Sequence, residues 1–185
     1  MLEVKRSNIE NSGLGVFATE NIKADTILTK YDGIFMPNEE FQNFNFKENS
    51  NLNPLAILQH DHLTTIGYKG FKDNKNCGQM INDYSLIRNI RYPSQNRLIE
   101  AINSYQEHST QKSNVSPVTL NNHHCMISYK DINAGEELYY HYGCIYWLIH
   151  IRGRNKDLST FINSYISDYR LYNEILSFKF NKNSK

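Results

Sequence analysis

Three short segments of the 185-residue sequence contain residues that could bind a ligand or transfer a group. The first is Gly13–Gly15, where two glycines let a ligand approach the backbone closely. The second contains Asn82, whose side chain can both donate and accept hydrogen bonds. The third is Tyr140–Gly143, and each of its two tyrosines offers a flat apolar face and a polar oxygen. Each segment alone is common, so only their order and spacing are informative.

The Gly-Leu-Gly segment differs from the glycine-rich turn of dinucleotide-binding proteins. Such a turn needs a third glycine and a helix whose N-terminus holds the phosphate groups. Here the third glycine is missing, and Val16–Ala18 continues as a predicted strand. A Rossmann-type methyltransferase is therefore disfavoured.

The order of the segments resembles the motif series of SET domain proteins. The resemblance covers roughly Val4–Trp147, and its most specific part is Gly-Glu-Glu-Leu followed by aromatic-x-Tyr-Gly. The matching segments, in chain order, are Gly13–Ala18, Tyr31–Gly33, Met80–Asp83, Asp131–Leu138 and Tyr140–Gly143.

The resemblance implies both a fold and an activity. The implied fold class is mainly β with helical insertions, in which short sheets form a knot-like SET fold of the β-clip type. The implied activity is that of a protein-lysine N-methyltransferase, with S-adenosyl-L-methionine on one face and the target lysine entering a narrow channel from the other. Family analogy favours a histone tail as the substrate class.

The resemblance also implies roles for individual residues. Tyr142 corresponds to the catalytic tyrosine and Tyr31 to a second tyrosine of the lysine channel. Asn89 and Tyr92 match an Asn and a Tyr that line the lysine site. Tyr140 occupies the position where a hydroxyl limits the number of methyl groups, so mainly mono- or dimethylation is expected. The implied cofactor contacts are Ser12, Gly13, Leu14, Gly15, Asn82, Asp83, Tyr146 and Trp147.

The implied chemistry depends mostly on positioning. Methyl transfer to lysine is an in-line displacement, which needs the amine and the methyl carbon aligned at roughly 3 Å. A desolvated channel and a neighbouring sulfonium charge both disfavour the ammonium form of the lysine. The reaction therefore requires no dedicated general base.

Two positions depart from the family pattern. Asp83 replaces the usual histidine, and His141 replaces the usual aspartate. One hypothesis is that the two compensate each other through a hydrogen bond or an ion pair, and the alternative is independent drift. Trp147, the only tryptophan, could pack on the adenine or belong to the core.

Hydrophobic spacing and turn residues predict the elements that carry these residues. Strands are expected within Val4–Lys30 and at Leu63–Ile66, Met80–Ile81, Cys125–Tyr129 and Glu137–Tyr140. Helices are expected at Glu39–Phe44, Gln95–Glu107 and Leu158–Leu176, with a loop at Ser109–Ser116. Residues 1–150 would form the SET domain, with insertions at about 37–62 and 94–118, and residues 151–185 a helical extension. That extension could cap the ligand site, pack on the core or form a homodimer surface.

Composition limits the other possibilities. A net charge of +1 gives no general attraction to nucleic acid or membranes, so direct nucleic-acid binding is not expected. Three widely spaced cysteines and no long apolar run predict an intracellular, soluble protein with reduced thiols, in the nucleus if its substrate is a histone. No metal is expected, because the adjacent His123 and His124 would point to opposite faces of a strand.

Two rival interpretations remain open at this stage. One is a catalytically silent SET fold that binds a peptide or protein partner. The other is an unrelated β-rich binding protein whose motifs match by chance, which would have no affinity for S-adenosyl-L-methionine.

Overall fold

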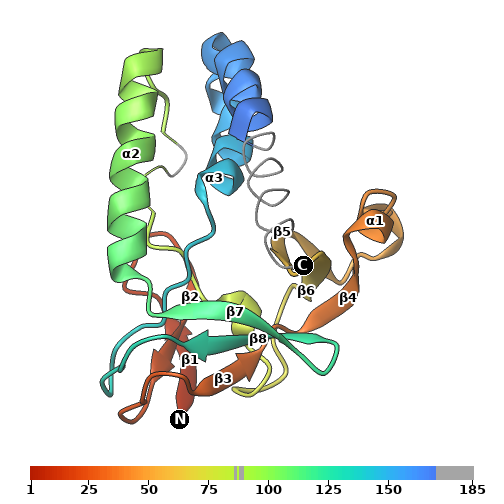
Figure 1. Cartoon of the computed structure of the whole chain (residues 1–185), viewed down its shortest axis with the longest axis vertical. Helices are drawn as coiled ribbons and strands as arrows, with labels where there is room; N and C mark the ends of the chain where they lie inside the picture. Colours follow the sequence, from red (N-terminus) through yellow and green to blue (C-terminus); the bar gives the residue numbers. More distant parts are fainter. Residues whose placement is uncertain (86, 88–89, 170–185) are drawn as a thin grey trace, which may run out of the picture. The chain divides into compact units, whose positions relative to one another are not determined.

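A computed structural model describes residues 1–85, 87 and 90–169 of the chain. The chain forms two compact units, whose elements are labelled in Figure 1. The first unit comprises Met1–Tyr84 and Lys112–His141, and the second comprises Ser85–Gln111 and the chain from Tyr142 onward. Each unit has its own hydrophobic core.

The first unit contains three small antiparallel sheets. The first sheet pairs β1 (Leu2–Arg6) with β2 (Leu14–Ala18). The second has the strand order β3 (Ile27–Lys30), β8 (His123–Ser128) and β7 (Val115–Leu120). The third has the order β4 (Gly33–Pro37), β6 (Leu63–Tyr68) and β5 (Leu52–His60). Together with the helices described below, these sheets confirm the predicted fold class.

Two hairpins of this unit close with two-residue turns in left-handed conformations. Asp61 and His62 join β5 to β6 with φ values of 51° and 61°. Asn121 and Asn122 join β7 to β8 with φ values of 47° and 58°. Positive φ at both central residues matches the twist of the flanking strands, and asparagine and aspartate tolerate it best after glycine.

The segment between β4 and β5 is held by aromatic packing. It contains α1 (Asn38–Phe41), which forms part of the predicted helix Glu39–Phe44, and a 3₁₀ turn at Phe46–Glu48. The Phe44 and Phe46 rings lie 5.0 Å apart, edge to face. Both pack against a small core formed by Met36, Leu52 and Ile66.

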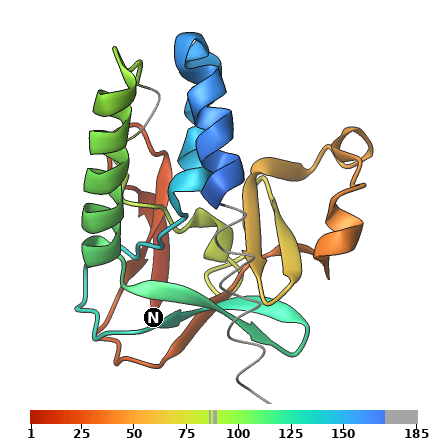
Figure 2. The same ribbon diagram turned by 45° about the horizontal axis from the view of Figure 1, so that its top comes forward.

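The second unit is helical. Its elements are α2 (Gln95–Lys112, with Lys112 in the first unit), α3 (Cys144–Ile151), 3₁₀ turns at Arg152–Arg154 and Lys156–Leu158, and a helix over residues 159–169. Figure 2 shows α2, in green, beside the blue helices. One face of α2 packs into the core of the second unit. Its buried residues Leu98, Ile102 and Tyr105 follow the predicted helical spacing. The predicted helix Leu158–Leu176 is thus described as far as residue 169, and its remainder lies outside the described residues.

Some of the predicted elements differ from the structure. The predicted strand Met80–Ile81 is wrong, because residues Gly78–Met80 form a 3₁₀ turn closed by a bond from the Met80 N–H to the Cys77 carbonyl (2.9 Å), and Ile81 follows it outside any strand. The predicted loop Ser109–Ser116 is also wrong, since α2 continues to Lys112 and β7 begins at Val115. Ser109 lies fully buried on α2, so a polar composition did not mark a surface loop there.

The predicted strand Glu137–Tyr140 forms only isolated bridges to Phe17 and Asn82. A side-chain amide takes the place of a neighbouring strand. Asn114 donates from Nδ2 to the Glu137 carbonyl (3.0 Å) and accepts at Oδ1 from the Tyr139 N–H (2.8 Å). The segment is therefore extended and hydrogen-bonded to its neighbours without belonging to a sheet.

The described chain contains no helix that is both long and apolar enough to cross a membrane. All three cysteines, Cys77, Cys125 and Cys144, are free and buried. Burial raises the pKa of each thiol above its ordinary value.

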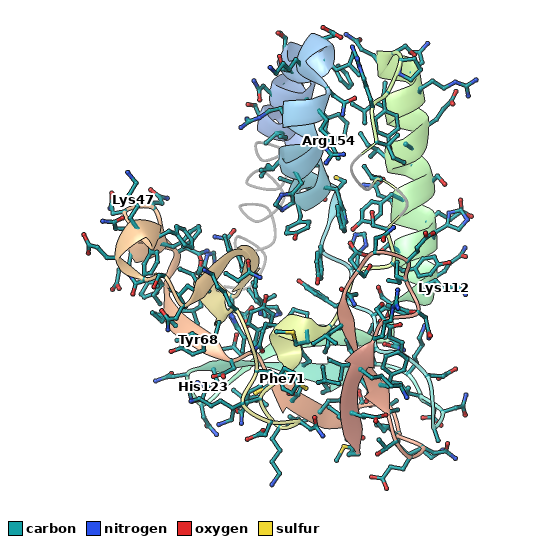
Figure 3. All side chains as sticks on the ribbon, turned by 180° about the vertical axis from the view of Figure 1, so that it is seen from behind. Lys47, Tyr68, Phe71, Lys112, His123 and Arg154 are labelled. Carbon is teal, nitrogen blue, oxygen red and sulfur yellow. The ribbon has the colours of Figure 1, made fainter. Side chains whose placement is uncertain are left out.

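His124 links two sheets of the first unit. Its neighbour His123 is exposed at the turn end of the hairpin (Figure 3), which confirms that the two rings point to opposite faces. The His124 ring is fully buried, 2.9 Å from Thr65 Oγ1 at Nδ1 and 3.2 Å from the His60 carbonyl at Nε2. The carbonyl can only accept, so Nε2 carries the proton and the Thr65 hydroxyl donates to Nδ1. Burial, the largest cause, lowers the pKa of His124.

This arrangement predicts an acid-sensitive fold. Unfolded histidine binds a proton with a pKa of 6.5, whereas folded His124 does so only at lower pH. Stability from His124 is therefore present above about pH 6.5 and lost below it, by up to about 1.4 kcal/mol per pH unit for one proton. The free energy of unfolding, measured with urea at pH 5 to 7.5, should change less with pH in His124→Gln than in the control His123→Gln. Equal changes in the two variants would contradict the assignment.

Candidate functional site

The predicted cofactor motif lies at the end of the β1–β2 hairpin. Gly13 adopts a φ of +71°, and its carbonyl accepts from the Ser7 N–H at 2.9 Å. A side chain there would meet open space, so the backbone at Gly13 is accessible. Leu14 is 47% exposed although it is a large apolar residue.

Asn82 brings the second predicted motif to the first. Its Nδ2 donates to the Leu14 carbonyl at 2.8 Å, across 68 residues of sequence. The backbone carbonyl of Asn82 accepts from the Tyr140 N–H at 2.9 Å. A parallel β-bridge joins Asn82 and Tyr139 at the same place. Three segments that the sequence picks out separately thus meet within the first unit.

The residues present at this site fit a polar ligand. A pocket of about 430 Å³ adjoins the hairpin end, and its lining residues are Arg6, Ser7, Ile9, Glu10, Asn11, Gly13 and Leu14. The hydroxyl of Ser12 is buried and has no hydrogen-bond partner among the described residues. A buried hydroxyl without a partner is costly, and a ligand with polar groups such as S-adenosyl-L-methionine would satisfy it.

Glu137 lies at the centre of this region and is only 3% exposed. Its Oε1 accepts from Ser7 Oγ (2.6 Å) and from Asn82 Nδ2 (3.4 Å). Its Oε2 accepts from the Asn8 N–H (2.7 Å) and the Tyr139 hydroxyl (3.0 Å). A Cβ on Gly15 would lie 2.1 Å from Oε1, so only glycine leaves room for the carboxylate.

From the sequence, Glu136 and Glu137 are each expected to be either a structural or a solvated carboxylate. The structure shows that the two residues differ in burial. Glu136 is exposed and accepts from the Asn133 N–H at 2.7 Å, which closes the preceding turn. Glu137 is the buried one.

The two departures from the family pattern interact electrostatically. Asp83 is 1% exposed, and its carboxylate raises the pKa of His141. Burial of the imidazole is the larger effect and lowers the pKa of His141 overall. Burial, followed by the charge of Asp83, raises the pKa of Tyr140 to about 12. The charge of Asp83 thus acts on both Tyr140 and His141, and a hydrogen bond or ion pair between Asp83 and His141 stays a prediction.

Tyr31 is held firmly in the first unit. Its N–H donates to the His124 carbonyl at 2.9 Å, and its ring packs against the main core. A Cβ on Gly67 would lie 3.2 Å from the Tyr31 ring, and one on Gly78 would lie 3.1 Å from its Cα. Gly67 and Gly78 thus pack closely against this tyrosine.

Tyr142, Tyr146 and Trp147 form an aromatic cluster in the second unit. The Tyr142 and Trp147 rings are nearly parallel with centroids 6.1 Å apart, and the Tyr146 ring meets that of Tyr142 at a steep angle at 4.8 Å. Gly143, with a φ of +89°, caps α3 and donates its N–H to the Tyr105 hydroxyl at 3.0 Å. Trp147 also packs against the core, so it has the structural role as well as its place in the cluster.

Tyr92 lies in the second unit too. Its N–H donates to Asn155 Oδ1 at 2.7 Å, and its ring packs against the core. Its hydroxyl is buried without a hydrogen-bond partner among the described residues, and burial raises its pKa. Asn89 lies outside the described residues.

The predicted residues thus fall into two groups, one in each unit. The first unit holds Ser12, Gly13, Leu14, Gly15, Tyr31, Asn82, Asp83 and Tyr140, and the second holds Tyr92, Tyr142, Tyr146 and Trp147. Sequence reasoning missed the positions of Ser7, Asn114 and Tyr105. No local signal marks them, because each acts through a contact distant in sequence.

Comparisons with known proteins found a matching family and matching solved structures. A crystal structure titled CpSET8 from Cryptosporidium is 18% identical, with a TM-score of 0.47, and the match covers 77% of this chain and 57% of that one. The matched part is thus little more than half the length of that protein. No curated protein sequence matches the chain. The SET domain family profile matches residues 13–143, more than half of the chain. This chain therefore belongs to the SET domain family, which is typical of protein-lysine methyltransferases.

Proposed function

We propose that the protein is an S-adenosyl-L-methionine-dependent protein-lysine N-methyltransferase that adds mainly one, or at most two, methyl groups. The observation that carries this proposal is the 2.8 Å hydrogen bond from Asn82 to the Leu14 carbonyl. Chance matches to two cofactor motifs would have no reason to meet in the fold. The partnerless Ser12 hydroxyl beside them supports the same assignment.

The cofactor, when bound, supplies an electrophilic methyl group on a sulfonium sulfur. Ser12, Leu14 and Asn82 would hold it through backbone and amide groups, with Gly13 and Gly15 allowing close approach. By family resemblance Tyr146 and Trp147, whose rings meet edge to face at 5.1 Å, would be the residues that contact adenine. Binding and alignment are the main contributions of these residues to the reaction.

The tyrosines would orient the lysine amine. Family resemblance assigns Tyr142 to the reacting centre, and it gives Tyr31 and Tyr92 the role of lysine-channel residues. Tyr140 stays protonated at neutral pH, since its pKa is raised to about 12. A protonated hydroxyl can donate a hydrogen bond to a water that crowds the amine, which supports a low degree of methylation.

A histone tail is the proposed substrate class, and a nuclear site of action would follow from it. The nearly balanced charge of the chain, +1, supports a protein substrate held by local contacts over direct binding to nucleic acid. The alternative function is a silent SET fold that binds a peptide. The substitutions at Asp83 and His141 are the observation that favours this alternative.

Tyr142→Phe distinguishes catalysis from silent binding. Loss of the hydroxyl should reduce transfer of labelled methyl groups to histones about 100-fold or more, as expected for one positioned polar group at the reacting centre. Binding of S-adenosyl-L-methionine, measured by calorimetry, should persist in the variant. Tyr68→Phe, a tyrosine of β6 that packs on a separate small core, is the matched control and should leave both signals unchanged.

The outcomes of this experiment separate the alternatives. Cofactor binding without methyl transfer by the unmutated protein, to histones and to a cell lysate, would favour the silent fold. Equal labelling by Tyr142→Phe and the unmutated protein would overturn the catalytic assignment.

Tyr140→Phe should raise the number of methyl groups added. Removing the hydroxyl removes the anchor for a water beside the amine, so mass spectrometry of the product should shift from mono- toward di- and trimethyl-lysine. Abundant trimethyl product from the unmutated protein would contradict the proposed role of Tyr140.

A further inference from the structure

We infer that Glu137 is a positioning residue for cofactor binding, acting through Asn82 and the hairpin end. The inference rests on the proposed function, since it concerns the same site. Glu137 does not line the pocket at the hairpin end. Its carboxylate joins segments 130 and 55 residues away in sequence, namely those of Ser7 and Asn82.

The four hydrogen bonds divide between the two oxygens in a way that requires an acceptor on both sides. The Asn8 N–H and the Asn82 amide nitrogen can only donate, and they face different oxygens, so a donor group cannot replace either oxygen without loss. Bonds to an ionised group are about twice as strong as neutral ones. Through the longer contact of 3.4 Å the carboxylate helps to orient the Asn82 amide, which in turn donates to the Leu14 carbonyl at 2.8 Å.

The hairpin end is fixed by the same group. Ser7 donates its hydroxyl to Oε1 and accepts at Oγ from the Ile9 N–H (3.1 Å), while Asn8 donates its N–H to Oε2. Ser7 and Ile9 both line the pocket. One buried charge thus sets the shape of the pocket wall and the orientation of Asn82 together.

Glu137→Gln disturbs one side of this arrangement selectively. The new amide nitrogen must face either the Asn8 N–H or the Asn82 amide. The Asn8 N–H cannot rotate, so the nitrogen should take the Oε1 position, where the Ser7 hydroxyl can turn to accept. Asn82 then faces another donor and loses its fixed orientation, although the side chain keeps its volume.

The experiment measures binding of S-adenosyl-L-methionine by calorimetry and the steady-state constants for methyl transfer. Glu137→Gln should raise the cofactor Kd and KM about tenfold, the effect of losing one charge-assisted hydrogen bond, with a much smaller change in kcat. Glu136→Gln, the same substitution at the adjacent exposed carboxylate, is the matched control and should bind as the unmutated protein does.

A double-mutant cycle separates positioning from general destabilisation. If Glu137 acts through Asn82, Glu137→Gln should cost little further affinity in an Asn82→Ala background. Additive losses would overturn the inference. If Glu137→Gln fails to fold, Ser7→Ala takes its place. This variant removes only one of the two donors to Oε1, so it should weaken cofactor binding about threefold.

The remaining outcomes are also decisive. Unchanged cofactor affinity in Glu137→Gln, or in Ser7→Ala if that variant takes its place, would overturn the inference and leave the proposed function standing. No cofactor binding by the unmutated protein would instead reject the proposed function, and the inference with it.

Discussion

A buried carboxylate is costly unless donors surround it, and the first unit is built around that constraint at Glu137. Four donors come from the β1–β2 hairpin end, from Asn82 and from Tyr139. Gly15 is required opposite the carboxylate because a side chain there would overlap it. Chain segments that begin and end the first unit are therefore tied together by one buried carboxylate.

The same region shows how side chains can substitute for a strand. Asn114 pairs with the backbone of residues 137 and 139, and Asn82 pairs with that of Leu14. A side-chain amide has one donor end and one acceptor end, so it imitates a peptide group while leaving the local chain free to curve. The extended segment from Glu137 to Tyr140 can thereby bring polar residues together without being committed to a flat sheet.

Much of the fold follows from local pattern. A strand over Val16–Ala18, the start of a helix at Gln95 and the opposite faces of His123 and His124 were all predicted, because each depends on the pattern of neighbouring residues. The 3₁₀ turn at Met80 and the extra turn of α2 were not, since packing decided them.

The site divides in the same way. Motif order predicted that Gly13–Gly15 and Asn82 belong together, and the structure brings them into contact. The burial of Glu137 was beyond sequence reasoning because its solvation is decided by partners as far as 130 residues away. A pattern of apolar and polar residues predicts on which face of a strand or helix a side chain lies. It does not predict which hydrogen-bond donors surround that side chain in the fold.

The three buried cysteines give the molecule a set of internal reporters. The thiolate is the reactive form, and burial both raises the thiol pKa and excludes an alkylating reagent. Labelling of each thiol therefore waits for a local opening of the structure around it. Cys77 and Cys125 belong to the first unit and Cys144 to the second. The rate of local opening can therefore be measured separately for each unit in one native sample, without any introduced probe.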